Sequence, residues 1–215
     1  MMFFVKKQRS GWVWVLALLV MIAGCAPPSS GSSANQELVY ASTADAAGLS
    51  PIMTNDSASS RVIDQIYETL FVRDPKTLKI KPKLAKSYEN PDPNTWIIHL
   101  RKGIQFHDGT PFDAKAVEYT FDKLRDPDTG APRASLLASV KEVEVKDADT
   151  VVLKTDKPYG PMLAALTHTN AAIVSPSADK EQDLMKKPIG TGPFQLEKWV
   201  QGDRLTLVPN PDSWG

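Results

Sequence analysis

A short apolar run lies near the start of the chain and is followed by a segment with almost no apolar side chains. The run covers residues 12–23, and the basic residues Lys6, Lys7 and Arg9 precede it. A membrane-spanning helix needs about 20 apolar residues to cross ~30 Å of hydrocarbon, so this run is too short. A basic start, a short apolar core and small residues after it are typical of a secretion signal. The pattern predicts a signal peptide at 1–24, and the alternative is an uncleaved membrane anchor.

The segment 26–36 is Pro, Ser and Gly with almost no apolar side chains. Such a segment cannot bury enough apolar surface to offset its ordering entropy, so we predict a flexible tether. Folded sequence is expected to begin at Glu37. The domain organisation is therefore a signal peptide at 1–24, a cysteine and tether at 25–36, and one folded domain at 37–215.

Apolar spacing in the first part of this domain predicts one strand and one helix. A strand is expected at Leu38–Ala41, and a helix capped by Ser57 or Ser59 should run to Leu70. The expected inward stripe consists of Val62, Ile63, Ile66, Tyr67 and Leu70. The expected outer face consists of Arg61, Asp64, Gln65 and Glu68.

Later segments alternate between strand and helix patterns. Period-two alternation predicts a strand at Trp96–Leu100 and further short strands later in the chain. The expected hairpins are 140–145 with 151–153 and 194–199 with 205–208, and a buried strand is expected at 172–174. Asp113 should cap a helix that runs to about Leu124, and Pro158 should begin another that ends at Leu166. The order lacks regular βαβ alternation, so the fold class is α+β, or mixed α/β.

Charge and cysteine content narrow the class of protein. The chain has 25 basic and 25 acidic residues, and removal of 1–24 takes away only three basic ones. The remaining 22 basic and 25 acidic residues give a net charge near −3. A nucleic-acid-binding domain needs a basic stripe or a pI above about 9, so no nucleic-acid partner is expected. The single cysteine, Cys25, has no partner for a disulfide.

The position of Cys25 points to a membrane anchor. Ile22-Ala23-Gly24-Cys25 resembles a lipobox, the site at which bacterial signal peptidase cuts before a lipid-modified cysteine. The two acyl chains of the thioether lipid, at ~0.8 kcal/mol per buried CH₂, give stable anchoring. A catalytic thiol or half of a disulfide are the alternatives, and the position directly after the apolar core disfavours both.

Two motifs suggest catalytic or phosphate chemistry but fit it poorly. His107-Asp108 is more simply a turn, and the histidines His99, His107 and His168 lack zinc-ligand spacing. Gly190-Thr191-Gly192 matches neither the dinucleotide nor the P-loop pattern, because no third glycine or Lys-Ser/Thr pair follows. We expect a tight turn there. No cofactor, metal site or enzymatic activity is expected.

Three blocks of the sequence carry a recognisable pattern. The most specific block runs from Leu84-Ala85 through Leu100-Arg101-Lys102-Gly103-Ile104 to Phe106-His107-Asp108-Gly109-Thr110-Pro111-Phe112-Asp113-Ala114. A second block runs from Ile189-Gly190-Thr191-Gly192-Pro193-Phe194 to Asn210-Pro211 and Trp214-Gly215. A weaker third one is Tyr67-Glu68-Thr69-Leu70. Together these blocks resemble extracellular solute-binding protein family 5, the peptide/nickel class of ABC-importer receptors.

The resemblance implies a periplasmic-binding-protein-like type II fold with two lobes that close over ligand. Family members are more than twice as long, so this chain is expected to be an N-terminal piece that carries lobe one. The implied function is a lipid-anchored, extracytoplasmic receptor that captures di- or oligopeptides and delivers them to ABC permease subunits and their ATPase. A receptor for nickel, glutathione or another small solute, or a non-functional fragment, is the alternative. An exported hydrolase or a structural lipoprotein would be rival classes.

Ligand contacts are expected in three loops. Thr54-Asn55-Asp56-Ser57 joins a strand to a helix N-terminus, whose N–H groups suit a peptide carboxylate or carbonyl, with simple N-capping as the alternative. Thr167-His168-Thr169-Asn170 is a second candidate, at the edge of the cleft. The resemblance places Gly192 near the lobe-one face of the cleft. The predicted ligand-binding residues are thus Asn55, Asp56, Ser57, His168, Asn170 and Gly192. The aromatic residues assigned to the core are Trp96, Phe112, Phe121, Phe194 and Trp199.

Overall fold

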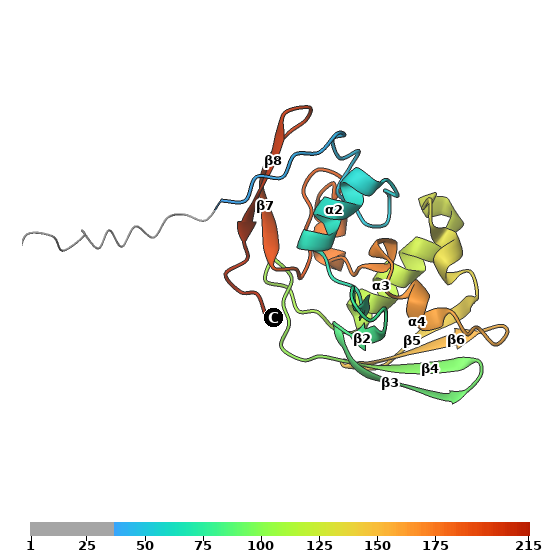
Figure 1. Cartoon of the computed structure of the whole chain (residues 1–215). Coiled ribbons are helices and arrows are strands. Elements are labelled where there is room, and N and C mark those ends of the chain that lie inside the picture. The colour runs from blue at the N-terminus through green and yellow to red at the C-terminus, as the bar shows by residue number, and fades with distance from the viewer. Residues whose placement is uncertain (1–36) are drawn as a thin grey trace, which may run out of the picture. The chain divides into compact units, whose positions relative to one another are not determined.

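The computed structural model describes residues 37–215 (Figure 1). The signal peptide, Cys25 and tether predicted at 1–36 lie outside the described residues. The chain divides into two units, of which one ends at Ala41 and the other is Ser42–Gly215. Residues 38–41 form no regular secondary structure and Leu38 is 92% exposed, so the strand predicted there is wrong. A short apolar run alone does not make a strand, because a strand also needs a hydrogen-bonded neighbour.

The larger unit is built on a four-stranded antiparallel sheet in the order β3-β4-β6-β5. The strands are β3 (Ala85–Asp92), β4 (Thr95–Leu100), β5 (Val140–Asp147) and β6 (Thr150–Thr155). The strand predicted at 96–100 and the hairpin predicted at 140–153 are confirmed. Strand β3 has no apolar alternation to predict it, because this edge strand is polar and exposed along almost its whole length.

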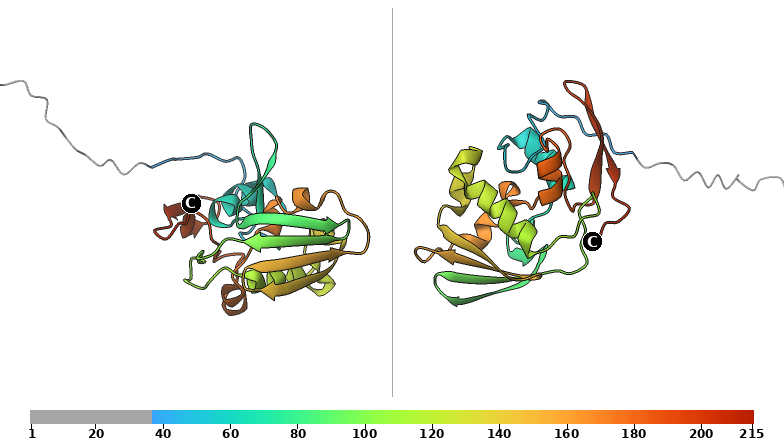
Figure 2. Two further views of the ribbon diagram at one scale, coloured as in Figure 1. Left: turned by 90° about the horizontal axis from the view of Figure 1, so that it is seen from below. Right: turned by 180° about the vertical axis from the view of Figure 1, so that it is seen from behind.

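Helix α3 (Ala114–Arg125) covers one face of this sheet (Figure 2). Asp113 caps it as predicted, since its Oδ1 accepts a hydrogen bond of 3.0 Å from the Ala116 N–H. Val117, Phe121 and Leu124 are fully buried and belong to the same core as Ile98 of β4. The buried face of β4 alternates with half-exposed residues, as a strand covered on one side should.

The other helices lie in the segments that precede and follow the sheet. They are α2 (Ser57–Ile66), α4 (Met162–Ala165) and α5 (Pro176–Glu181). The 3₁₀ turns η1 (Pro127–Thr129) and η2 (Ala134–Leu137) lie between α3 and β5, and η3 (Thr169–Ala171) lies between α4 and α5. Helix α2 ends four residues before the predicted Leu70, because Tyr67 turns to extended backbone. Helix α4 is shorter than the predicted 158–166. Residues 172–174 are buried but form no strand. The Ile173 N–H donates to Glu68 O, and the Val174 N–H donates to Thr120 Oγ1.

Two separate hairpins complete the unit. The first pairs β1 (Phe71–Arg73) with β2 (Ile80–Pro82), and the second pairs β7 (Phe194–Val200) with β8 (Arg204–Pro209). The second hairpin confirms the pairing predicted at 194–208. Phe194 and Trp199 are only half-buried, so their assignment to the core is wrong, whereas Trp96, Phe112 and Phe121 are buried. The fold class is mixed α/β, as predicted, and no helix within 37–215 is long and apolar enough to cross a bilayer.

Candidate functional site

Helix α2 is the element around which the predicted ligand-contact loops gather. Its N-cap is Asp56, whose Oδ1 accepts a hydrogen bond of 2.8 Å from the Ser59 N–H. The predicted caps, Ser57 and Ser59, are therefore wrong. Ser59 is fully buried, and its hydroxyl oxygen accepts the N–H groups of Ala47 and Gly48 at 2.9 and 3.3 Å. Ser59 thus fixes the incoming chain against α2.

Asn170 joins the two predicted loops to each other. Its side-chain amide donates to Pro51 O at 2.6 Å and also to Thr54 O. Asn170 is only 2% exposed, so its amide serves the protein interior. Thr169 Oγ1 donates to Asp64 Oδ1 at 2.7 Å and ties the same 3₁₀ turn to the side of α2. The hydrogen bond from Asn170 to Thr54 joins residues that are 116 positions apart in sequence. The loops at 54–57 and 167–170 therefore form one structure.

His168 is half-buried beside this junction. Its Nδ1 accepts the Asn170 N–H at 3.2 Å and caps η3. Burial lowers the pKa of His168, and the positive charge of Arg133 lowers it further, whereas Asp64 acts in the opposite direction. The ring therefore favours the neutral form that this hydrogen bond requires.

Asn55 and Ser57 are the predicted residues that stay open to solvent. Both are exposed, and neither side chain has a hydrogen bond within the described part of the chain. Asp56 between them is half-exposed. Burial opposes the charged form of Asp56, but hydrogen bonds from Ser59 and nearby N–H groups outweigh it, and the net effect lowers its pKa. The N-terminus of α2 therefore presents an ionised cap flanked by two unengaged polar side chains.

Gly192 lies at the opposite end of α2. Its N–H donates to Ile66 O at 2.8 Å, and its carbonyl accepts His107 Nε2 at 2.9 Å and Asn210 Nδ2 at 3.1 Å. A Cβ on Gly192 would meet the backbone of Gln65 and Ile66 at 2.6 Å, so this close approach requires glycine. The backbone of Gly192 is thus engaged within the protein.

His107-Asp108 holds the same loop and a neighbouring turn. The Gly190 N–H donates to His107 Nδ1 at 3.4 Å, which fixes the neutral tautomer with its proton on Nε2. Burial lowers the pKa of His107 against the opposing effects of the Gly192 carbonyl, Asp108 and Glu68. Asp108 Oδ2 accepts from the Ser175 hydroxyl at 2.7 Å. These contacts agree with the structural interpretation of the dipeptide.

A buried carboxylate that sequence analysis misplaced connects three distant segments. Glu68, predicted on the outer face of a helix, is 7% exposed because α2 ends before it. Its carboxylate accepts the Thr191 hydroxyl at 2.9 Å and Trp214 Nε1 at 2.7 Å, and it pairs with Lys83 Nζ at 3.1 Å. The block Tyr67-Glu68-Thr69-Leu70 marked the segment but gave no sign of these partners.

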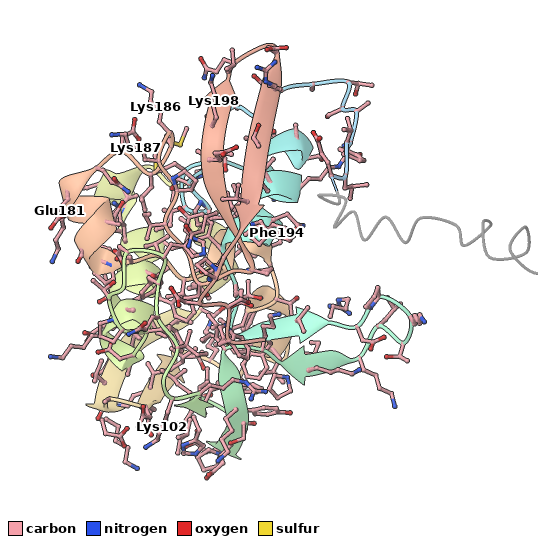
Figure 3. All side chains as sticks on the ribbon, turned by 90° about the vertical axis from the view of Figure 1, so that its left-hand side faces the viewer. Lys102, Glu181, Lys186, Lys187, Phe194 and Lys198 are labelled. Carbon is pink, nitrogen blue, oxygen red and sulfur yellow. The ribbon has the colours of Figure 1, made fainter. Side chains whose placement is uncertain are left out.

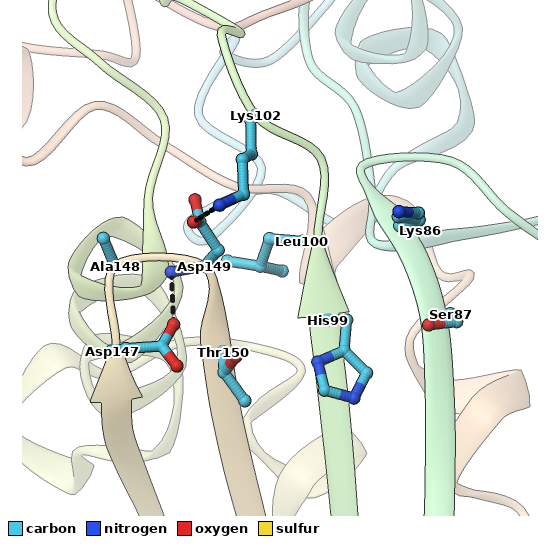
Figure 4. Close-up of a pocket in the computed structure, with 9 residues that line it drawn as sticks. All are labelled: Lys86, Ser87, His99, Leu100, Lys102, Asp147, Ala148, Asp149 and Thr150. Carbon is cyan, nitrogen blue, oxygen red and sulfur yellow. Dashed lines mark hydrogen bonds and ion pairs between the residues drawn. The ribbon is translucent and has the colours of Figure 1, made fainter.

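Two shallow depressions lie outside the loops at 54–57 and 167–170. One, of about 460 Å³, is lined by residues from the ends of β3 to β6, including His99, Lys102 and Asp149 (Figure 4). The other, of about 550 Å³, lies between the 182–189 segment and β7, with Lys186, Lys187 and Lys198 at its rim (Figure 3). Neither is lined by a predicted ligand-binding residue. Within 37–215 no group of three His, Cys, Asp or Glu side chains could hold a metal ion.

Comparison with known proteins gives a consistent family assignment. Residues 79–215 match the model of "Bacterial extracellular solute-binding proteins, family 5 Middle". The glutathione-binding protein GsiB of Escherichia coli O1:K1 is 34% identical over 210 residues, which is 96% of this chain and 40% of that protein. The chain thus spans about two fifths of the length of the curated relatives it matches.

Solved structures agree with this assignment. Haemophilus influenzae OppA in complex with RPPGFSPFR is similar at a TM-score of 0.74 and 28% identity, over 80% of this chain and 37% of that one. NikZ from Campylobacter jejuni in complex with Ni(L-His) is similar at a TM-score of 0.71 and 25% identity, over 79% of this chain and 34% of that one. These neighbours share the mixed α/β fold of one part of a larger binding protein.

Proposed function

Because this chain belongs to the bacterial extracellular solute-binding proteins of family 5, we propose that it is the part of an ABC-importer receptor that binds a small peptide. The family consists of binding proteins and not of enzymes. The observation that carries the choice of ligand is the 34% identity, across 96% of this chain, to a protein named for glutathione binding. The peptide RPPGFSPFR in a structural neighbour supports the same ligand class.

The proposal assigns ligand contact to the N-terminal end of α2. Asn55 and Ser57 are open to solvent there, and Asp56 adds a carboxylate whose negative charge offsets the positive end of the helix dipole. This arrangement suits the N–H or ammonium groups of a peptide better than its carboxylate. Three of the predicted residues have a positioning role and do not contact ligand, since their polar groups bond within the protein and hold the loops around α2. They are His168, Asn170 and Gly192.

The proposal also covers the rest of the predicted organisation. A signal peptide at 1–24 would be cut before Cys25, which would carry the lipid anchor, and 26–36 would tether the domain 37–215 outside the cytoplasmic membrane. Permease subunits and their ATPase would receive the peptide. The residue pattern at 22–25 supports the anchor. Mass spectrometry of the chain purified from a bacterial membrane fraction tests it, because lipidation adds two or more acyl chains at Cys25.

Nickel is the second candidate ligand, and the similarity to NikZ in complex with Ni(L-His) is the observation that favours it. Glutathione, a mixture of short peptides and Ni(L-His) can be compared in one experiment. A ligand that binds the native state adds about 2.7 kcal/mol to the free energy of unfolding when its concentration is a hundred times Kd, and it thereby raises the melting temperature. The proposal expects such a shift with glutathione or the peptides. A shift with Ni(L-His) alone would favour the second candidate, and a cooperative melt that no ligand moves would contradict both.

A further inference from the structure

The hairpin of β1 and β2 ends in an exposed leucine with strained backbone. Leu78 has φ 58°, and it is the one non-glycine residue with positive φ among residues 37–215. A bulky residue in the left-handed region is a genuine outlier, since this turn position normally takes glycine or asparagine. The Leu78 side chain is 62% exposed, so no burial compensates for the strain.

The turn that presents Leu78 is firmly organised. Asp74 Oδ1 accepts the N–H groups of Lys76 and Thr77 at 3.0 and 2.8 Å, and Leu78 N–H donates to Asp74 O at 2.8 Å. The other carboxylate oxygen of Asp74 pairs with Lys81 at 2.5 Å. Lys81 is the main cause that lowers the pKa of Asp74, followed by the bonds from Thr77. The tip therefore holds its shape without a partner.

Positive charge surrounds this apolar tip. The hairpin and its turn, residues 71–82, carry four cationic side chains and one carboxylate. The cationic residues are Arg73, Lys76, Lys79 and Lys81. Val72 on the same hairpin is also exposed. Figure 2 shows the hairpin standing away from the four-stranded sheet. A single exposed leucine needs no explanation, but a strained one at the tip of a protruding cationic hairpin does.

We propose that the β1–β2 tip docks on the anionic lipid headgroups of the membrane to which the chain is anchored, with Leu78 inserted at the interface. Cations attract an anionic bilayer surface, and an apolar side chain among them enters the headgroup boundary. The inference rests on the anchor at Cys25 in the proposed function. The sixteen residues between Cys25 and Ser42 reach at most about 58 Å when extended, which limits how far the folded unit can move from its anchor.

A fluorescent probe at the tip tests the docking. The full chain carrying Thr77→Cys is labelled with an environment-sensitive dye and reconstituted into vesicles of phosphatidylcholine with or without phosphatidylglycerol. A matched probe at Ala148→Cys, on the exposed turn between β5 and β6, serves as the control. The labelled chain without an added cysteine reports whether Cys25 is lipidated. A Cys25→Ser version of each labelled chain, held on the vesicle by a polyhistidine tag and a chelating lipid, keeps the domain at the surface without the lipid anchor and leaves one cysteine for the dye. Failure of the anchor prediction is thereby distinguished from failure of docking.

The expected result is protection of the probe at 77 from iodide in anionic vesicles only, with loss of protection at high salt. Leu78→Asn, which tolerates the left-handed backbone, should lower the ratio of docked to free tip about tenfold. Its melting temperature should stay the same or rise, whereas a purely structural role for Leu78 would lower it. Equal iodide access at 77 and 148 in anionic vesicles would overturn the proposal. Protection that appears only when permease is present would overturn it in favour of a protein partner.

Discussion

Substitution of Gly190 by alanine should separate the 190–192 loop from α2. A Cβ on Gly190 would lie 2.1 Å from Ile66 O and 2.8 Å from both Ile66 C and Tyr67 Cα. All three atoms belong to the backbone, so no side chain can move aside to make room. The loop must retreat and strain its hydrogen bond from Gly192 N to Ile66 O, now 2.8 Å long.

The expected loss of stability follows from these contacts. Overpacking in a filled interior costs about 1–3 kcal/mol, and a weakened hydrogen bond adds about 1 kcal/mol. We therefore expect Gly190→Ala to lower the free energy of unfolding by roughly 3 kcal/mol. Equilibrium urea unfolding, followed by tryptophan fluorescence and far-UV circular dichroism, measures the difference.

Gly160→Ala is the matched control. A Cβ on Gly160 meets no atom within 4 Å, and its φ lies outside the positive range. Its unfolding free energy should stay unchanged or rise by less than about 1 kcal/mol, because alanine restricts the unfolded chain. If the two variants unfold within roughly 0.5 kcal/mol of each other, the loop does not pack against α2 as described.

Three further outcomes follow from the same contacts. Glu68→Gln should lower the free energy of unfolding by about 1–3 kcal/mol, because it weakens the bonds to Lys83 and Trp214. Urea unfolding measures this loss, and a red shift of native tryptophan emission should accompany it. Burial lowers the pKa of His107 below its usual 6.5, so the unfolded state takes up a proton first and stability should fall as the pH drops below about 6.5. His107→Gln should flatten that slope, and an unchanged pH profile would show that the ring is not held neutral. Asn170→Ala should lower stability by about 1–3 kcal/mol through loss of two buried hydrogen bonds, whereas Asn55→Ala should leave stability unchanged and weaken ligand binding.

Elements set by local pattern were predictable from sequence. Asp113 precedes a run with a helical apolar period, and the β5–β6 and β7–β8 hairpins alternate around polar turns, so both kinds of element carry their own signal. β3 carries no such signal, because an exposed edge strand has no need of apolar residues. Residues 172–174 are as apolar as a strand but lie where no neighbouring strand exists to pair with them.

The arrangement of the candidate site was less accessible from sequence. The sequence suggested the loops at 54–57 and 167–170 separately. The hydrogen bond from Asn170 to Pro51 crosses 119 residues, and no local pattern reports it. The helical period placed Glu68 on the outer face of α2, yet the helix ends two residues earlier and the side chain is buried. Whether a polar side chain faces ligand or the interior depends on such long-range partners, which periodicity does not encode.

Amide hydrogen exchange with and without glutathione, and then with the peptide mixture, reports ligand binding and its location together. We expect ligand to slow exchange in residues 54–60 and 167–170, at the N-terminal end of α2, and to leave the β5–β6 turn unchanged. Slowed exchange confined to other segments would contradict the assigned site. Identical exchange in every peptide of a folded chain, at saturating glutathione and peptide, would contradict the proposal that this part of the receptor contacts a peptide.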